Sequence, residues 1–194
     1  MWNINNVIEF TRFLNQFRAV KRTIYVPWED RMENDAEHSF QLAMLAWYFI
    51  EVFDLELDLI LVIKYALIHD LVETYAGDVY FYTSSLKELE EKDKREKQAA
   101  KQIQENFSEF EEMNNLIQSY EQKENEESKF IYSLDKLLPV INIYLDEWRT
   151  FREFNVSLDV LFELKDMKIS ESQKVHEVWK ELVELMKKRQ DKLF

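Results

Sequence analysis

Two of the three histidines in this chain stand beside an acidic residue in an apolar stretch. His69 precedes Asp70 at the end of a long apolar run, and His38 follows Glu37 at the start of another. Asp135 lies in a third apolar stretch far downstream. Burying such polar groups is costly unless something binds them. Two imidazoles and two carboxylates suit one divalent transition metal such as Mn, Fe, Co, Ni or Zn. We therefore predict a metal site made of His38, His69, Asp70 and Asp135.

Glu73 is a further acid close to the His–Asp pair. On one continuous helix, Glu73 would lie one turn after His69 and three residues after Asp70, so the three side chains would face the same pocket. A divalent ion activates water and polarises a phosphoryl oxygen, and Glu73 can hydrogen-bond that water without being a ligand. The chemistry indicated is hydrolysis of a phosphate ester. The third histidine, His176, stands among charged residues and is predicted to be a surface residue.

The composition favours long helices in one domain over residues 1–194. The chain has one glycine and two prolines, and 46% of its residues are hydrophobic. Since glycine and proline mark turns and strands, their scarcity favours helices joined by polar turns. A single glycine also excludes the glycine-rich loops that bind phosphates in other folds.

The charge of the chain limits its partners. The net charge is −13, so a broad basic surface for nucleic acid or for an anionic membrane is not expected. A small anionic substrate stays compatible, because a metal and a few local cations can reverse the field inside one pocket. The absence of cysteine excludes disulfides, and the N-terminal residues do not resemble a secretory signal. With no stretch that could span a bilayer, we expect a cytoplasmic protein.

The hydrophobic periodicity predicts an all-α domain of about seven or eight helices. We expect helices at about residues 4–19, 35–53, 58–75, 85–107, from 108, around 130–141, at 157–167 and from 170. Residues 20–34 are predicted to form a connection. Gly77, the lone glycine, fits the left-handed position just after a helix.

Three segments resemble one known family. Arg31–Ser39 resembles the pattern R-x-E-N-x-x-E-H-S, His69–Asp78 resembles H-D-x-x-E-x-x-x-G-D, and Ser133–Leu137 matches a late aspartate. Together they are similar to the HD-domain metal-dependent phosphohydrolases, in particular to the YfbR-like 5′-deoxynucleotidase branch. The resemblance extends from about residue 5 to about residue 150.

The resemblance implies an α-helical HD fold, usually dimeric, that removes phosphate from deoxyribonucleoside 5′-monophosphates. It assigns the four predicted ligands to the metal, Glu73 to the attacking water and Asp78 to the sugar hydroxyl. A basic residue before the first histidine of the family usually engages the phosphate. Arg22 is the nearest match in this chain, with Lys21 beside it.

The segment after Asp78 departs from the family pattern. The family commonly continues with a proline-containing segment and a lysine, whereas this chain continues Val79-Tyr80-Phe81-Tyr82-Thr83, with Lys87 further on. This segment helps to wall the nucleotide pocket, so the departure bears on the identity of the substrate. Trp28 follows Pro27 in the loop beside the basic pair and is the candidate for stacking on the base.

Other functions remain open on the sequence alone. A deoxynucleoside triphosphate triphosphohydrolase would use the same metal site, although few pocket cations are available for a full triphosphate. A non-catalytic HD module could bind a nucleotide or a protein, and a structural helical dimer would leave both His–acid pairs unexplained. The Gly-Tyr-Pro signature of cyclic-dinucleotide phosphodiesterases is absent. Thr74 stands where guanosine tetraphosphate hydrolases carry an acid.

Overall fold

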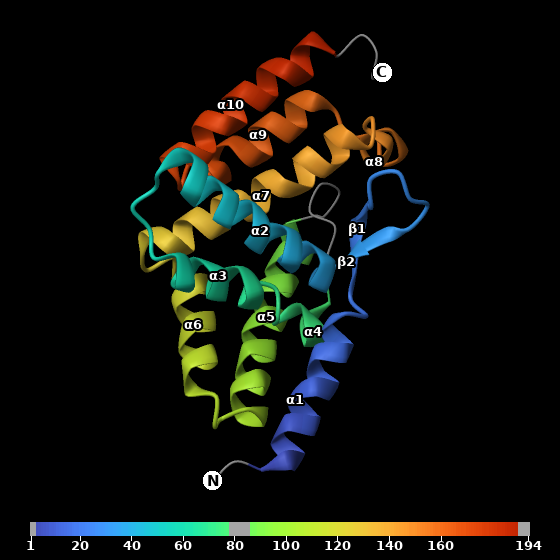
Figure 1. Ribbon diagram of the computed structural model, residues 1–194. Helices are drawn as coiled ribbons and strands as arrows, with labels where there is room; N and C mark the ends of the chain where they lie inside the picture. The colour runs from blue at the N-terminus through green and yellow to red at the C-terminus, as the bar shows by residue number, and fades with distance from the viewer. Residues whose placement is uncertain (1–2, 78–85, 190–194) are drawn as a thin grey trace.

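Helix α7 (Glu126–Leu145) runs through the middle of the protein (Figure 1). The computed structural model describes residues 3–77 and 86–189. Buried apolar residues recur along α7 at helical spacing, including Phe130, Leu134, Leu137 and Leu138. The elements that α7 contacts include α2 (Asp35–Phe53), α3 (Leu59–Ile68), α6 (Glu111–Gln122), α9 (Leu158–Ile169) and α10 (Gln173–Lys188). A residue on the inner side of α7 is therefore enclosed by several helices.

The remaining helices extend on both sides of this centre. In Figure 1, α9 and α10 lie above α7, whereas α1 (Ile4–Phe17), α5 (Leu86–Asn106) and α6 point downward. Two short helices, α4 (Glu73–Ala76) and α8 (Arg149–Glu153), complete the helical elements of the described residues. Eight of these helices have ten or more residues. The prediction of an all-α domain with seven or eight helices is confirmed.

Helix α2 has the predicted bounds, and two reciprocal sets of hydrogen bonds cap its first turn. The Asn34 side chain accepts hydrogen bonds from the backbone N–H groups of Ala36 and Glu37, both at 3.1 Å. The Glu37 side chain in turn accepts from the backbone N–H of Asn34 at 3.2 Å. This capping box fixes the start of the helix, and it places His38 in the first turn.

Residues 20–34 were expected to form a plain connection, and that expectation was wrong. They contain an antiparallel hairpin of β1 (Lys21–Tyr25) and β2 (Met32–Asn34), with Lys21 opposite Asn34. The strands are too short to show a clear alternation of apolar and polar residues in the sequence, although Ile24 of β1 is buried. The backbone N–H of Asp35 donates to the carbonyl of Val20, so the hairpin leads directly into α2.

The third helix ends at Ile68, seven residues before the predicted end. After it, the N–H groups of Leu71 and Glu73 donate to carbonyls three residues back instead of four. The tighter turn therefore separates His69 and Glu73 into two helices. Gly77 follows α4 with a φ of +74°, so the positive φ expected at this glycine is present, but its ψ of 149° differs from that of the predicted left-handed helical conformation.

Within the described residues, the helices are too short or too polar to cross a bilayer. The cytoplasmic location expected from the sequence stays a prediction.

Candidate metal centre

The four predicted metal ligands come from two helices and the turn after a third, which meet at the centre of the protein. His38 lies in the first turn of α2, His69 and Asp70 lie in the turn after α3, and Asp135 lies midway along α7. The two histidines and Asp135 are buried, with exposed fractions of 0%, 4% and 2%. Asp70 is half-buried. The fold thus brings all four side chains to one buried place.

The spacing of the donor atoms suits one metal ion. One donor atom from each of the four residues lies within 4.8 Å of the others. His38 Nε2 is 2.9 Å from Asp135 Oδ1, which is 3.7 Å from His69 Nε2. His69 Nε2 is also 3.0 Å from Asp70 Oδ2. Ligands bonded to one ion at about 2.1 Å lie roughly 3 to 4.2 Å apart, so small movements would complete a coordination shell.

The hydrogen bonding of His69 fixes which ring nitrogen faces the cluster. Its Nδ1 lies 2.9 Å from the carbonyl oxygen of Ala66, which can only accept, so Nδ1 carries the proton. Nε2 is then the ring nitrogen that faces the cluster and can bind a metal, and this buried atom makes no hydrogen bond within the described residues. A histidine that binds a metal typically donates its other ring N–H in this way. The donor set therefore fits a divalent metal.

The charges of the cluster also favour a cation. Burial opposes protonation of His69, but the carboxylates of Asp70 and Asp135 outweigh it and raise its pKa to about 10. Burial acts to raise the pKa of both carboxyl groups, yet His69 and Arg22 hold the pKa of Asp70 below its usual range. Lys136 and His38 do the same for Asp135. The site attracts positive charge, which a metal would supply in place of the proton.

Arg22 reaches into this cluster from β1. Its Nη1 is 2.7 Å from Asp70 Oδ2 and 3.3 Å from Asp35 Oδ1, and its Nε is 3.4 Å from Glu33 Oε2. Glu33 Oε2 also lies 3.6 Å from His38 Nδ1. The guanidinium therefore holds the carboxylate of a candidate ligand in place, in addition to any contact with a phosphate. Glu33 and Asp35 are not among the residues predicted from the sequence, although both stand in the segment that resembles the family pattern.

Glu73 is buried beside the same cluster. Its exposed fraction is 5%, and its Oε1 is 3.1 Å from Lys92 Nζ on α5. Oxygen atoms of Asp35, Asp70 and Glu73 also approach within 4.8 Å of one another. The tight turn after α3 thus leaves Glu73 near Asp70, even though the two are not on one continuous helix.

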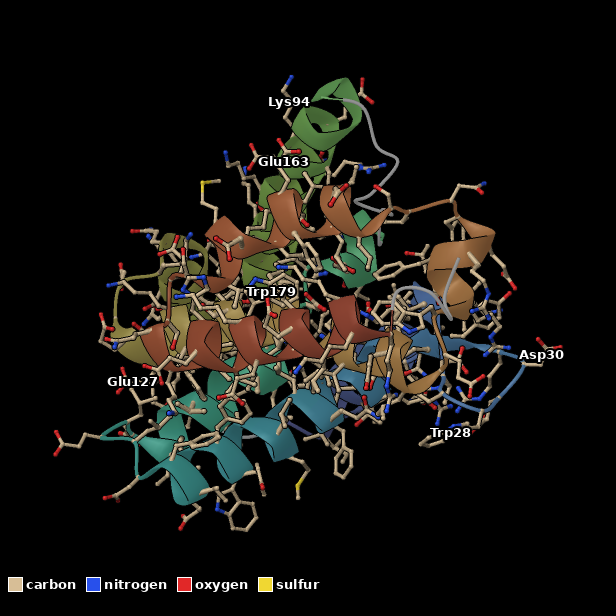
Figure 2. All side chains as sticks on the ribbon, turned by 90° about the horizontal axis from the view of Figure 1, so that it is seen from above. Trp28, Asp30, Lys94, Glu127, Glu163 and Trp179 are labelled. Carbon is tan, nitrogen blue, oxygen red and sulfur yellow. The ribbon has the colours of Figure 1, made fainter. Side chains whose placement is uncertain are left out.

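The other predicted substrate contacts lie elsewhere. Lys21 is exposed, because successive residues of a strand point to opposite faces and Arg22 takes the inner one. Trp28 is 81% exposed and stands at the outer end of the hairpin, at the edge of the molecule (Figure 2). The structure therefore does not place Trp28 as a wall of the buried cluster. Asp78 and the segment Val79–Thr83 lie outside the described residues.

The sequence of this chain matches the model of one known protein family. A family model described as "HD domain" matches residues 14–179. The chain belongs to the HD-domain family. All four candidate ligands fall inside the matched region, and the resemblance to HD-domain proteins that the sequence motifs indicated is confirmed.

Named relatives of this HD-domain protein include two called 5′-deoxynucleotidase HDDC2. The protein from Mus musculus is 32% identical over 133 residues, which cover 67% of this chain and 64% of that protein. The protein from Danio rerio is 28% identical over 144 residues, covering 73% and 70%. The chain thus matches somewhat less than two thirds of the mouse relative's own length.

Solved structures show the same HD-domain architecture. The crystal structure of a predicted metal-dependent phosphohydrolase from Magnetospirillum magnetotacticum superposes with a TM-score of 0.81 at 26% identity, and the match covers 96% of both chains. A conserved hypothetical protein from Pyrococcus furiosus gives a TM-score of 0.62 at 18% identity over 93% of this chain and 99% of that chain, which shows the fold alone.

Proposed function

We propose that this HD-domain protein is a metal-dependent phosphohydrolase that releases phosphate from deoxyribonucleoside 5′-monophosphates. His38, His69, Asp70 and Asp135 bind the divalent metal in this proposal. The observation that carries it is the convergence of one donor atom from each of these four residues, all within 4.8 Å of one another. The names of the two vertebrate relatives support the monophosphate substrate.

The metal and the residues around the cluster have different roles in the proposed reaction. A divalent ion in this site supplies Lewis-acid activation of water and of a phosphoryl oxygen. Glu73 accepts the proton of the attacking water as the new P–O bond forms. The bond from phosphorus to the 5′ oxygen breaks, and the deoxynucleoside leaves as an alcohol after its 5′ oxygen takes up a proton from solvent water. Arg22 orients the Asp70 carboxylate through the contact at 2.7 Å.

A substrate panel tests the proposed activity. The protein loaded separately with Mn²⁺, Co²⁺ or Zn²⁺ is incubated with nucleoside mono-, di- and triphosphates, and released phosphate is measured. We expect phosphate from at least one deoxynucleoside monophosphate and a lower rate with the matching ribonucleotide. Asp78→Ala should reduce that preference, because the family resemblance places Asp78 at the sugar hydroxyl.

The same panel separates the alternatives. Release of triphosphate from a deoxynucleoside triphosphate, with monophosphates unchanged, would assign the triphosphohydrolase activity instead. Nucleotide binding without turnover, with full metal occupancy, would assign a non-catalytic HD module.

We also propose that the protein is a homodimer that associates through the outer face of α2. Five large apolar side chains are exposed at helical spacing on this face: Phe40, Met44, Trp47, Tyr48 and Val52. Together they expose on the order of 500 Å², whereas a monomer seldom exposes more than a few hundred in one patch. Glu51 is the one charged residue from position 38 to position 52, in a chain with 32% charged residues.

A second copy of this chain is the occupant that fits this face. Two copies that each carry a net charge of −13 repel one another, and they approach best through a surface that carries little charge. Beside the outer face of α2, Ala36 and Ser39 line an apolar cavity of about 470 Å³. Residues of α1, α3 and α6 also line this cavity. In a two-fold interface each copy presents both projections and hollows, so aromatic side chains of one copy can enter the cavity of the other.

The introduction of negative charge on α2 tests the proposed dimer interface. We expect the unaltered protein to sediment as a dimer, and Phe40→Glu combined with Trp47→Glu to sediment as a monomer, because buried carboxylates would lose their hydration. Met167→Glu is the control, since Met167 is 76% exposed on α9, away from this face. A monomeric unaltered protein, or a dimer that persists in the double variant, would contradict the proposed interface.

A further inference from the structure

Glu33 is a buried carboxylate on β2, immediately before the Asn34 cap of α2. Its exposed fraction is 2%, whereas its neighbours Met32 and Asn34 are half-buried. Since successive residues of a strand face opposite sides, the hairpin directs this one side chain of β2 toward the interior. A glutamate is seldom buried so completely unless it is paired. The groups that surround Glu33 therefore indicate its role.

Three elements contact the Glu33 carboxylate. Its Oε2 lies 3.4 Å from Arg22 Nε on β1 and 3.6 Å from His38 Nδ1 on α2. Its Oε1 accepts a hydrogen bond from Asn142 Nδ2 on α7 at 3.3 Å. Because α7 also carries Asp135, the carboxylate is held between the hairpin and two helices that each carry a candidate ligand.

The two ring nitrogens of His38 have different neighbours. Nε2 lies 2.9 Å from Asp135 Oδ1, so Nε2 is the nitrogen that faces the ligand cluster. Nδ1 lies nearest to Glu33 Oε2, and both of these buried atoms lack a hydrogen bond within residues 3–77 and 86–189. Their separation of 3.6 Å is only slightly longer than a hydrogen bond. A small movement of either side chain would therefore join them.

A metal ion on Nε2 of His38 would determine which ring nitrogen carries the proton. In a neutral imidazole one nitrogen donates and the other accepts, so the proton would lie on Nδ1, opposite the Glu33 carboxylate. Histidines that bind a metal typically donate their second N–H to a carboxylate or a backbone carbonyl. His69 has the carbonyl of Ala66 for this purpose, at 2.9 Å. Glu33 is the carboxylate in the corresponding position beside His38.

The contact with Arg22 does not by itself explain the position of Glu33. Arg22 Nη1 is 2.7 Å from Asp70 Oδ2 and 3.3 Å from Asp35 Oδ1, so the distance of 3.4 Å from Arg22 Nε to Glu33 is the longest of these three ion pairs. Charge-assisted N–H···O bonds are typically about 2.7 to 2.9 Å long. Asp70 is therefore the principal partner of Arg22 among the three carboxylates.

We propose that Glu33 is a positioning residue for the metal centre, whose carboxylate accepts a hydrogen bond from Nδ1–H of His38 when Nε2 binds the ion. This inference rests on the ligand set of the proposed function. The hydrogen bond fixes the rotation of the imidazole ring, and the negative charge makes Nε2 a stronger ligand. Asn142 in turn holds the carboxylate from α7.

Metal affinity tests this role without any turnover. Isothermal titration calorimetry gives the affinity of the metal-free protein for Zn²⁺. Loss of such a partner typically weakens metal binding by 10- to 100-fold, so we expect about 10-fold for Glu33→Gln, which keeps a neutral acceptor, and about 100-fold for Glu33→Ala. Glu29→Gln is the matched control and should bind Zn²⁺ normally. Glu29 lies between the two strands of the same hairpin, and its side chain is 53% exposed.

Nuclear magnetic resonance of the ring N–H groups shows whether Glu33 acts through His38. The chain has three histidines, so a protein labelled with ¹⁵N-histidine gives few signals. With saturating Zn²⁺ we expect slowly exchanging Nδ1–H signals from His38 and His69, because both rings are buried. Glu33→Gln should shift the His38 signal, since a neutral acceptor replaces a charged one. The His69 signal should stay in place, because its acceptor is the carbonyl of Ala66.

The combined results distinguish this role from the proposed activity. An unaltered protein that does not bind Zn²⁺, or a Glu33→Gln variant that binds it normally, overturns the role, and in the second case hydrolysis of the nucleotide panel would leave the proposed function standing. Weaker binding with an unchanged His38 signal, or with equal shifts of both signals, also overturns it, because Glu33 would then act through Arg22 or through a general change of the site. If Zn²⁺ affinity and the His38 signal both depend on Glu33 while no nucleotide is hydrolysed, the role of Glu33 stands and the proposed activity falls.

Discussion

Asp135→Asn should abolish both metal binding and phosphate release. Asp135 Oδ1 lies between His38 Nε2 and His69 Nε2, at 2.9 and 3.7 Å, so its charge is central to the cluster. A neutral amide of the same size cannot supply that charge. A metal contributes several kcal/mol to stabilising a transition state of this kind, so we expect turnover to fall by roughly 10³-fold or more. Inductively coupled plasma mass spectrometry should find close to one metal per chain in the unaltered protein and little in the variant.

Thermal stability supplies a measurement that is independent of activity. A ligand that binds only the folded state raises its melting temperature, so Mn²⁺ should stabilise the unaltered protein and leave Asp135→Asn unaffected. Asp146→Asn is the matched control, since Asp146 caps the same helix and pairs with Arg149 at 2.8 Å, outside the cluster. A variant that retained both a full equivalent of metal and the thermal shift would remove Asp135 from the ligand set.

The sequence was sufficient to predict which four side chains converge, because each of them breaks a local pattern. Histidines are scarce in this chain, and two of them interrupt apolar helical stretches beside an acid. The helical periodicity placed His38 on α2 and Asp135 on α7, and those helices are present. Secondary structure is predicted most reliably in strongly periodic segments of this kind.

The features that the sequence did not predict depend on contacts between distant segments. The end of α3 at Ile68 depends on three-residue hydrogen bonds in the following turn, where the apolar pattern itself continues. The hairpin depends on pairing between two short strands. Glu33 and Asp35 acquire their role only when Arg22 arrives across that hairpin. In each case tertiary context overrides the local preference.

Lys165 is an instructive intermediate case. In the sequence it lies four residues after Leu161 and four before Ile169, so it interrupts an apolar stripe much as the ligand histidines do. It was not selected, because a lysine on a helix rich in charged residues is typically solvated. The packing of α9 on α7 is what buries this position.

Glu73→Gln should retain the metal and lose most of the activity. Glu73 is buried next to Asp70 but is not one of the four donors that meet at His69, so its loss leaves the ligand set intact. The amide keeps the size of the side chain and an oxygen for the contact with Lys92 at 3.1 Å. It cannot accept the proton of the attacking water. General base catalysis is worth about 10²- to 10⁴-fold, and we expect kcat to fall by that amount while metal content stays close to one per chain.

A variant of the neighbouring Glu96 distinguishes proton transfer to Glu73 from an electrostatic effect of Glu73 on Lys92. Lys92 Nζ lies 3.3 Å from Glu96 Oε1 and 3.1 Å from Glu73 Oε1, so both carboxylates share one lysine. If the role of Glu73 were only to hold Lys92, Glu96→Gln should reduce kcat to a comparable degree. If Glu73 accepts the proton, Glu96→Gln should retain most of the activity, because Glu96 is not among the acidic groups that converge on Asp70. Normal turnover by Glu73→Gln with full metal occupancy would assign the base elsewhere in the site.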